Sequence, residues 1–246
     1  MQQVFVDARQ VNDEIVTIQG EDARHLGRVV RIRPGEEVRV SVRGGRDYYG
    51  HVLTVDREEM TVKLVEEAAS TELAQKICLF QAIPKGDRME TVIEKAVELG
   101  VYEIVPVETR YCVVRLDEKK KAKKRERWQA IAANAARQSK RSIIPRIAPV
   151  TPYQKALDDA GDADLVLLPY ENARGMQATG EALTAVAHAG GIGIFIGPEG
   201  GFAADEIKAA QGKDNVRVIS LGRRILRTDT AAIAAMTMVM MACESR

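Results

Sequence analysis

The chain has 246 residues, of which 46% are hydrophobic and 29% charged, and its formal net charge is +1. This length and composition indicate a globular protein with one large domain or two smaller ones. The net charge is close to zero, so the overall charge of the protein would not attract nucleic acid. The three cysteines are far apart, no apolar run is long enough to cross a membrane, and residues 1–7 lack the pattern of a signal peptide. We therefore expect a cytoplasmic protein with no metal and no membrane partner.

The first seventy residues are rich in short β-forming segments. Pro34-Gly35 and Gly44-Gly45 are among the turn signals between them. The predicted strands are residues 4–6, 14–18, 37–42, 48–55 and 60–64. Strands spaced this closely predict a small barrel or sandwich. Residues 21–31 predict a helical turn that gathers four arginines, namely Arg24, Arg28, Arg31 and Arg33.

From residue 76 onward, strand and helix patterns alternate, which predicts a parallel sheet covered on both faces. The predicted strands are residues 77–83, 104–107, 146–150, 165–168, 192–196 and 216–220. The predicted helices are residues 87–99, 117–139, 153–160, 177–189, 204–211 and 230–243. The first helix has the clearest ends, with Asp87 as its N-cap and Gly100 as its stop. We place the domain boundary in the polar segment 66–75, giving domains 1–70 and 71–246.

Basic residues are concentrated in the middle of the chain. Residues 119–127 hold seven basic side chains, and residues 137–146 hold four more without an acid. A local basic stripe is typical of a surface that binds phosphates. A solvated helix face explains the same pattern equally well, so both interpretations stay open.

Three of the predicted strands end in loops that could hold a ligand. Residues 192–196 run into GPEGGF at 197–202, and residues 216–220 lead into LGRRILRTDTA at 221–231. A third strand ends in LPYE at 168–171. Ligands of open α/β sheets lie outside the carboxyl ends of the strands, and glycines let the backbone approach a ligand closely. This pattern predicts one ligand site walled by these loops.

The common nucleotide-binding loops do not fit. Gly191-Ile192-Gly193 precedes a strand, so it is no dinucleotide loop, and GPEGGF lacks the Gly-Lys-Ser/Thr of a P-loop. GPEGGF alone could be a tight turn between a strand and a helix. Thr228 or Asp229 could cap the last helix. The histidines, His25, His51 and His188, have no neighbouring residues in the sequence that would form a catalytic group or a metal site with them.

Together, GPEGGF and LGRRILRTDTA resemble the paired C-terminal motifs of the RsmE family, bacterial small-subunit rRNA (uracil-N3)-methyltransferases of the SPOUT class. The resemblance extends to EKAVELGV at 94–101, to ARQSKR at 136–141 and, more loosely, to the family's PUA-like RNA-binding domain at residues 25–35. Asp229 stands where a glutamate is common, which keeps the carboxylate and shortens its reach.

The resemblance implies an α/β fold, with a SPOUT-type parallel sheet and a C-terminal trefoil knot following a small N-terminal PUA-like β-barrel domain. It implies S-adenosylmethionine as the cofactor, with Leu168, Ile196, Ile225 and Leu226 enclosing the adenine. The full set of cofactor-binding residues implied is Leu168, Pro169, Tyr170, Glu171, Ile196, Gly197, Glu199, Gly200, Gly201, Leu221, Gly222, Ile225, Leu226, Thr228 and Ala231.

The implied reaction is direct methyl transfer to uracil N3 in small-subunit (16S) ribosomal RNA. Arg227 and Arg223 would stabilise negative charge on the uracil. Glu199 and Asp229 are the nearest carboxylates to act as base, with backbone capping favoured for Asp229. The implied RNA-binding residues are Arg24, Arg28, Arg31, Arg33, Arg137, Lys140 and Arg141.

The resemblance also implies a homodimer with the last helix at the interface. Two alternatives remain open. One is a SPOUT methyltransferase that acts on another RNA base or on a ribose 2′-hydroxyl. The other is a non-catalytic RNA-binding protein of ribosome assembly.

Overall fold

The computed structural model describes residues 1–173 and 175–245. Its contacts divide the chain into two compact units. The N-terminal unit comprises Met1–Glu72 and Ala136–Ile144, and the C-terminal unit comprises Leu73–Ala135 and Pro145–Arg246. The boundary expected after residue 70 lies close to Glu72. Residues 136–144 were expected in the second domain, whereas their contacts place them in the N-terminal unit.

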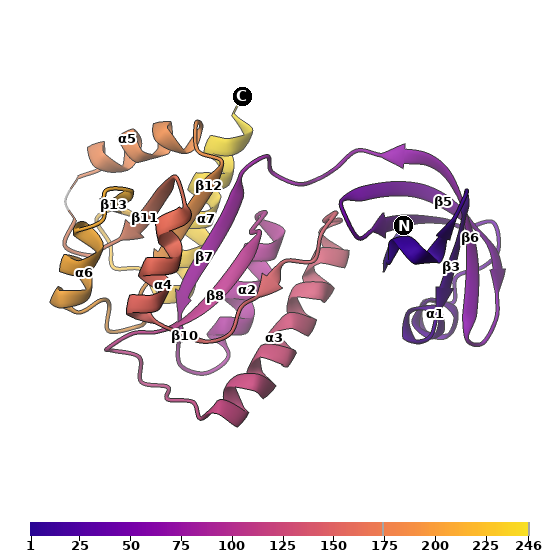
Figure 1. Ribbon diagram of the computed structural model, residues 1–246, viewed down its shortest axis with the longest axis horizontal. Coiled ribbons are helices and arrows are strands. Elements are labelled where there is room, and N and C mark those ends of the chain that lie inside the picture. Colours follow the sequence, from indigo (N-terminus) through magenta and orange to yellow (C-terminus); the bar gives the residue numbers. More distant parts are fainter. Residues whose placement is uncertain (174, 246) are drawn as a thin grey trace. The chain divides into compact units, whose positions relative to one another are not determined.

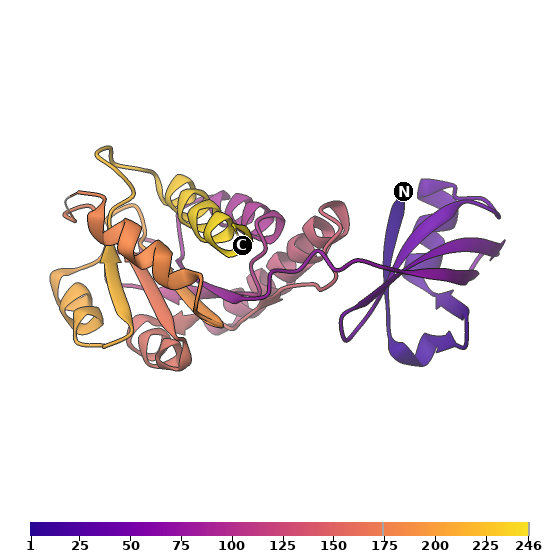
Figure 2. The ribbon, with the colours of Figure 1, turned by 90° about the horizontal axis from the view of Figure 1, so that it is seen from above.

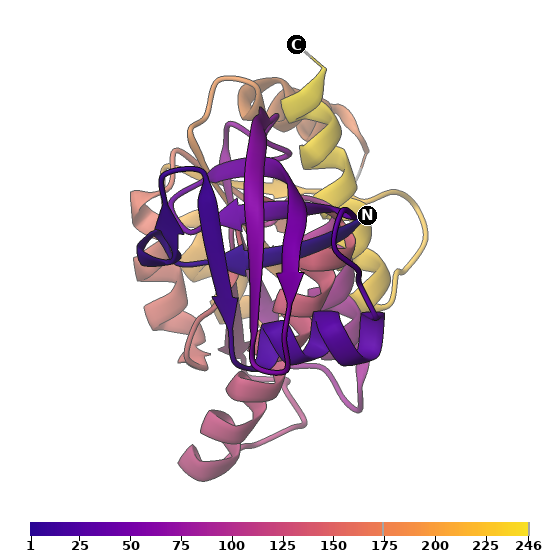
Figure 3. The same cartoon turned by 90° about the vertical axis from the view of Figure 1, so that its right-hand side faces the viewer.

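The N-terminal unit is built on one curled sheet (Figure 3), with strand order β1-β4-β5-β6-β3-β2. The strands are β1 Gln2–Val6, β2 Val11–Asn12, β3 Ile15–Gln19, β4 Glu37–Val42, β5 Arg46–Val55 and β6 Glu59–Ala68. β1 runs parallel to β4, and the other pairs are antiparallel. Alternate residues such as Val38, Val40 and Val62 point into one apolar core, as the period of a β-strand dictates. All five strands predicted here are present.

A short helical segment lies between β3 and β4, as predicted. It consists of α1, Glu21–Arg24, and the π-helical stretch η2, His25–Val30. Ala23 and Leu26 pack into the core of the N-terminal unit. The segment ends at Arg31, whose φ of 60° is left-handed. A further short helix, η1, covers Ala8–Gln10.

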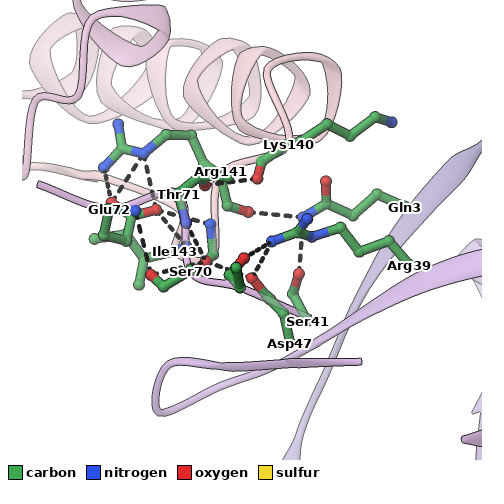
Figure 4. A network of polar contacts seen from close by, with 12 residues as sticks. Gln3, Arg39, Ser41, Asp47, Ser70, Thr71, Glu72, Lys140, Arg141 and Ile143 are labelled. Carbon is green, nitrogen blue, oxygen red and sulfur yellow. Dashed lines mark hydrogen bonds and ion pairs between the residues drawn. The ribbon is translucent and has the colours of Figure 1, made fainter. Parts of the chain in front are cut away.

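Residues 136–144 are held in the N-terminal unit by buried polar contacts (Figure 4). Arg141 is only 3% exposed and forms an ion pair with Glu72, which also accepts a hydrogen bond from the Ser142 amide at 2.7 Å. The Ser142 hydroxyl donates to Asp47, which is also paired with Arg39 at 2.5 Å. Breaking one partner of such a buried pair is strongly destabilising, so Arg141 has a structural task in this unit.

The C-terminal unit contains a parallel sheet, as predicted, with strand order β10-β8-β7-β12-β11-β13 and β9 paired to β8 (Figure 1). The strands are β7 Lys76–Ala82, β8 Glu103–Glu108, β9 Arg146–Ile147, β10 Thr151–Pro152, β11 Leu165–Pro169, β12 Gly191–Ile196 and β13 Val216–Ile219. The strand predicted at 146–150 stops at Ile147. Pro149 has no N–H to donate to a ladder, which explains the early end.

Helices cover both faces of this sheet (Figure 2). They are α2 Arg88–Glu98, α3 Glu118–Gln138, α4 Tyr153–Asp159, η3 Ala160–Asp162, α5 Gln177–Val186, α6 Ala204–Gln211 and α7 Thr228–Glu244. On one face, α4 and α6 pack over the stacked rings of Phe80 and Phe195, whose centroids are 4.4 Å apart. α2, α5 and α7 lie on the opposite face. Within residues 1–173 and 175–245, no helix is both long and apolar enough to cross a membrane.

The predicted N-cap residue of α2 is in place, but it does not cap through its side chain. Asp87 occupies the N-cap position of α2, but its side chain makes no capping hydrogen bond. Its φ of −98° and ψ of 6° differ from the extended backbone that usually aims a capping side chain at the first turn.

Candidate active site

Three loops meet at one edge of the C-terminal sheet. β12, β11 and β13 are neighbouring parallel strands, so the loops that follow them lie at the same end. We call these the β11 loop (residues 170–173), the β12 loop (residues 197–203) and the β13 loop (residues 220–227). The Tyr170 amide donates to the Ile219 carbonyl at 3.0 Å, which joins the ends of β11 and β13. The predicted gathering of the three loops is therefore present.

The glycines of the β12 loop stand where a side chain would meet a neighbour. A Cβ at Gly200 would lie 3.0 Å from the Cβ of Tyr111, and one at Gly197 would lie 3.3 Å from the Phe202 ring. Gly201 has a left-handed φ of +68°, and its Cβ would lie 2.9 Å from Glu171 Oε1. These positions therefore form a tight backbone cradle that larger residues would fill.

Glu199 holds the β12 loop against the segment between β7 and α2. Its Oε1 accepts hydrogen bonds from the Lys85 amide at 3.0 Å and from Arg88 Nη1 at 2.6 Å. Partial burial acts to raise the pKa of Glu199, but backbone amides and the Arg88 guanidinium outweigh it and hold the pKa below its ordinary value. A carboxylate so engaged is a weak proton acceptor, so this contact favours a positioning role for Glu199.

Thr228 joins the β12 loop to the start of α7. Its hydroxyl donates to the Gly197 carbonyl at 2.7 Å and accepts from Gln81 Nε2 at 3.0 Å. Neither Thr228 nor Asp229 caps α7, because the N-cap residue is Arg227 and no side-chain capping bond is made. Asp229 Oδ1 is buried and has no hydrogen-bond partner in the part of the chain that the structure describes.

The β13 loop is much more exposed. Arg223, Arg224 and Arg227 face solvent, and Ile225 is 80% exposed. No ion pair joins these arginines to a carboxylate among residues 1–173 and 175–245. Gly222 has a φ of +109°, and a Cβ there would meet nothing within 4 Å. The loop can therefore offer its cations to an anionic ligand.

The apolar residues expected to enclose the adenine differ in exposure. Leu168 and Ile196 are 0% and 2% exposed, so their side chains belong to the core of the C-terminal unit. Leu226 is half-buried, whereas Ile225 is solvent-exposed. Four further cofactor-binding predictions are half-buried, namely Pro169, Tyr170, Leu221 and Ala231, whereas Glu171 is exposed. Direct contact with a cofactor stays a prediction for all of these residues.

The predicted RNA-binding residues fall into two groups within the N-terminal unit. Exposed cations follow one another around α1 and η2, at Arg24, Arg28, Arg31 and Arg33, and of these Arg24 pairs with the exposed Glu58 at 3.6 Å. The second group is engaged: Arg137 pairs with Asp22 at 3.3 Å, Lys140 Nζ donates to the Met1 carbonyl at 2.9 Å, and Arg141 is buried against Glu72. The first group is therefore the better surface for phosphates.

Part of the basic stripe is also satisfied within the protein. On α3, Lys121 pairs with Glu108 at 3.1 Å, and Arg127 pairs with Glu90 at 2.8 Å. These contacts support the structural interpretation of the stripe for those two residues.

Sequence reasoning missed three residues of the site, namely Gln81, Arg88 and Tyr111. Arg88 could have been found from the sequence, because it is a cation at the N-terminus of a helix. A cation there is unfavourable with the helix dipole, which indicates an anionic partner from another part of the chain. Gln81 and Tyr111 are single polar or aromatic residues at strand ends, and nothing in the local pattern identifies them.

Comparison with known proteins identifies the class. A family described as RNA methyltransferase domain matches residues 71–240, and one described as RNA methyltransferase PUA domain matches residues 18–65. The chain is 32% identical to ribosomal RNA small subunit methyltransferase E of Bacillus subtilis, covering 97% of this chain and 96% of that protein. It is 31% identical to the Mycobacterium tuberculosis protein of the same name, covering 94% and 88%.

Solved structures agree with these matches. A ribosomal RNA small subunit methyltransferase E from Neisseria gonorrhoeae, bound to S-adenosyl methionine, superposes with a TM-score of 0.82 at 30% identity and covers 98% of this chain and 97% of its own. A Legionella pneumophila protein solved with the bound cofactor SAM gives 0.83 at 29% identity, covering 98% and 96%. The chain therefore belongs to the ribosomal RNA small subunit methyltransferase E family.

Proposed function

We propose that this protein transfers the methyl group of S-adenosylmethionine to N3 of a uracil in small-subunit (16S) ribosomal RNA. The observation that carries the proposal is the cradle of Gly197, Gly200 and Gly201 at the edge where three parallel strands end. A cofactor of this kind needs close backbone approach and a few placed polar groups, which this edge offers. Membership of the family supplies the identity of the cofactor and the substrate.

The residues present fit the cofactor. The β12 loop would hold it by backbone groups at Gly197, Gly200 and Gly201, with the β11 and β13 loops on either side. When bound, S-adenosylmethionine supplies an electrophilic methyl group on a sulfonium, so the protein needs neither a metal nor a covalent nucleophile. The task of the chain's own residues is to orient the uracil and exclude water.

Charge develops on the uracil as N3 loses its proton. We assign Arg227 and Arg223, which are exposed on the β13 loop, to donate hydrogen bonds to the uracil oxygens and stabilise that charge. Glu199 is engaged with Lys85 and Arg88, so we assign it to positioning and not to proton transfer. Asp229, whose Oδ1 accepts no hydrogen bond from the described residues, is the favoured acceptor of the N3 proton.

The proposal includes a homodimer, with the outer face of α7 at its interface. Ile233 and Met240 on this helix are only half-buried, and Met241 is 58% exposed. Such an apolar face supports association with a second copy. Light scattering should then give twice the 27.1 kDa mass of the chain. A mass of one chain at micromolar concentration would contradict the dimer.

Two further expectations belong to the same proposal. We infer a trefoil knot at the C-terminal end, and the hydrogen bond from Thr228 to Gly197, which brings the start of α7 against the β12 loop, supports it. We also infer a cytoplasmic location, because ribosomal RNA is the substrate.

The decisive experiment uses small ribosomal subunits from a strain that lacks the modification. The purified protein is incubated with these subunits and S-adenosylmethionine, and the nucleosides are analysed by mass spectrometry. We expect 3-methyluridine, and none when S-adenosylmethionine is omitted. A 2′-O-methyl nucleoside, or another methylated base, would overturn the assigned chemistry.

Calorimetric titration separates the enzyme from a non-catalytic RNA-binding protein. We expect S-adenosylmethionine to bind with a Kd in the micromolar range or below. Absence of binding by a folded protein would contradict the proposed activity altogether.

A further inference from the structure

The segment that follows β8 carries an exposed row of side chains that the proposed reaction has not used. Tyr111 is 48% exposed and Val113 is 63% exposed, and Arg115 also faces solvent. The residues between them, Cys112 and Val114, pack inward against Ala82 and Ile83. The segment 111–115 thus presents an aromatic ring, an aliphatic side chain and a cation outward at every second residue. Large apolar side chains exposed in a cluster mark an interaction surface.

This segment is fixed in place next to the β12 loop. A Cβ at Gly200 would lie 3.0 Å from Tyr111 Cβ, so the tyrosine lies directly against the glycine cradle. Glu206, only 8% exposed, accepts a hydrogen bond from the Arg110 amide and another from the Ala203 amide, each at 2.8 Å. One buried carboxylate therefore holds both the exposed row and the end of the β12 loop.

Two arginines, Arg110 just before the segment and Arg115 at its end, differ in whether an ion pair already engages them. Arg110 is paired with Asp205 at 2.6 Å, whereas Arg115 forms no ion pair within residues 1–173 and 175–245. The Arg115 guanidinium donates to the Arg110 carbonyl at 3.2 Å, which holds its side chain along the segment. The end of the row is therefore cationic.

We propose that Tyr111, Val113 and Arg115 form a ledge that binds single-stranded RNA beside the target uracil. The Tyr111 ring stacks on a base, Val113 contacts the next nucleotide, and Arg115 pairs with a phosphate. Bases held outside a duplex are recognised by stacking on aromatic rings, and phosphates by cations. The proposal rests on the proposed function, because it takes RNA as the substrate. It adds a positioning surface distinct from the cofactor-binding loops and from the exposed arginines of the N-terminal unit.

The first test compares Tyr111→Ala with Tyr102→Ala. Tyr102 is a matched control, because it is 43% exposed and precedes the same strand that Tyr111 follows, at the opposite end of the sheet. Loss of one stacked base should raise the Kd for unmodified small subunits about 5- to 150-fold in Tyr111→Ala. Tyr111→Phe and Tyr102→Ala should retain the wild-type Kd. The Kd for S-adenosylmethionine should stay within about twofold of wild type in all three variants, because alanine keeps the Cβ that faces Gly200.

The second test gives a spectroscopic signature of stacking. Trp128 is 1% exposed, so it contributes a nearly constant background to the fluorescence. In Tyr111→Trp, the added tryptophan should be quenched on titration with single-stranded oligouridylate, and in Tyr102→Trp it should not. Equal quenching in the two variants, or none in Tyr111→Trp, would contradict the proposal that the ledge binds RNA.

Other outcomes also contradict the proposal. Equal loss of cofactor and RNA affinity in Tyr111→Ala would show that the residue only supports the β12 loop. If the mass of Tyr111→Ala in light scattering differed from that of wild type, the surface would instead bind a second copy of the chain. If the wild-type protein forms no 3-methyluridine, the proposed function fails, while the oligouridylate titration still decides whether the ledge binds RNA.

Discussion

The β12 and β13 loops follow strands that end at the same edge of the sheet, and both contain glycine. They differ in how firmly contacts with the rest of the protein hold them. The β12 loop is held by contacts at successive residues, from the hydrogen bond at Gly197 to the ion pair of Glu199 with Arg88. The β13 loop presents Arg223, Ile225 and Arg227 to solvent.

This difference indicates a division of labour within one site. A loop held in place beforehand binds its ligand without the cost of ordering itself, which suits a cofactor that is used in every turnover. An exposed loop with cations can adapt to a large substrate and order on contact with it. We therefore assign the cofactor to the β12 loop and the uracil to the β13 loop, and the changes below test that assignment.

The largest effect is expected from Gly200→Val. Its Cβ would lie 3.0 Å from Tyr111 Cβ, and its methyl groups would fill the space next to the cradle. We expect binding of S-adenosylmethionine to disappear in calorimetry, while affinity for small subunits falls by no more than in Tyr111→Ala. Equal loss of both, with a lowered Tm, would indicate misfolding and would leave the cradle without support.

Gly161→Val, in the short helix η3, is the matched control for this change, because Gly161 belongs to none of the three loops. A Cβ there would meet nothing within 4 Å. Cofactor affinity should therefore remain within about threefold of wild type.

Arg227→Ala should lower kcat by about a hundredfold, because removing one preorganised donor to a developing oxyanion typically costs that much. Cofactor affinity should be unchanged. Arg224→Ala, in the same exposed loop but without an assigned role, is the control. Single-turnover rates at saturating cofactor measure both variants, and similar rates for the two would remove Arg227 from the reaction.

Glu199→Gln should weaken S-adenosylmethionine about tenfold, because a charge-assisted hydrogen bond is worth roughly 1.5–3 kcal/mol and this one is partly exposed. At saturating cofactor its kcat should stay near that of wild type. Arg88→Met should behave alike, and the double variant should be no worse than either single change, since the two residues act as one clamp. A kcat lowered a hundredfold with unchanged cofactor affinity would instead make Glu199 the base.

The smallest effect is expected in the pH dependence of stability. The pKa of Glu199 lies below its ordinary value of 4.5 in the folded protein, so the clamp stabilises the fold fully above that value. The stabilisation is lost as the pH falls through the folded pKa, where the carboxylate takes up a proton. Urea denaturation should show wild type more stable than Glu199→Gln at pH 7, and the difference in stability should narrow as the pH falls below 4.5. A difference that stays constant would contradict the ion pair.

Much of the architecture is predictable from local patterns. The run Ile192–Ile196 is a strand because apolar β-branched residues fill both buried faces of a parallel sheet, and the same pattern predicts β7, β8, β11 and β13. The gathering of the loops followed from strand direction alone. Three glycines within residues 197–201 predicted the cradle.

The contacts that define the site were not predictable. Glu199 meets Lys85 and Arg88 across more than a hundred residues, and a single sequence holds no record of such a pairing. Arg141 resembles a surface cation in sequence, yet Glu72 and the surrounding backbone bury it. Tyr111 gave no signal because its importance comes from the neighbouring Gly200, which only the fold brings next to it.

The placement of residues 136–144 has a consequence for synthesis of the chain. Arg141 and Ser142 complete the polar contacts of Glu72 and Asp47, but the ribosome makes them long after the strands of the N-terminal unit. That unit must wait with an unpaired Glu72, and with Asp47 held by Arg39 alone, until the end of α3 has emerged. Vectorial folding from the N-terminus is therefore interrupted here, and a nascent chain arrested before residue 136 should hold a loosened, protease-sensitive sheet.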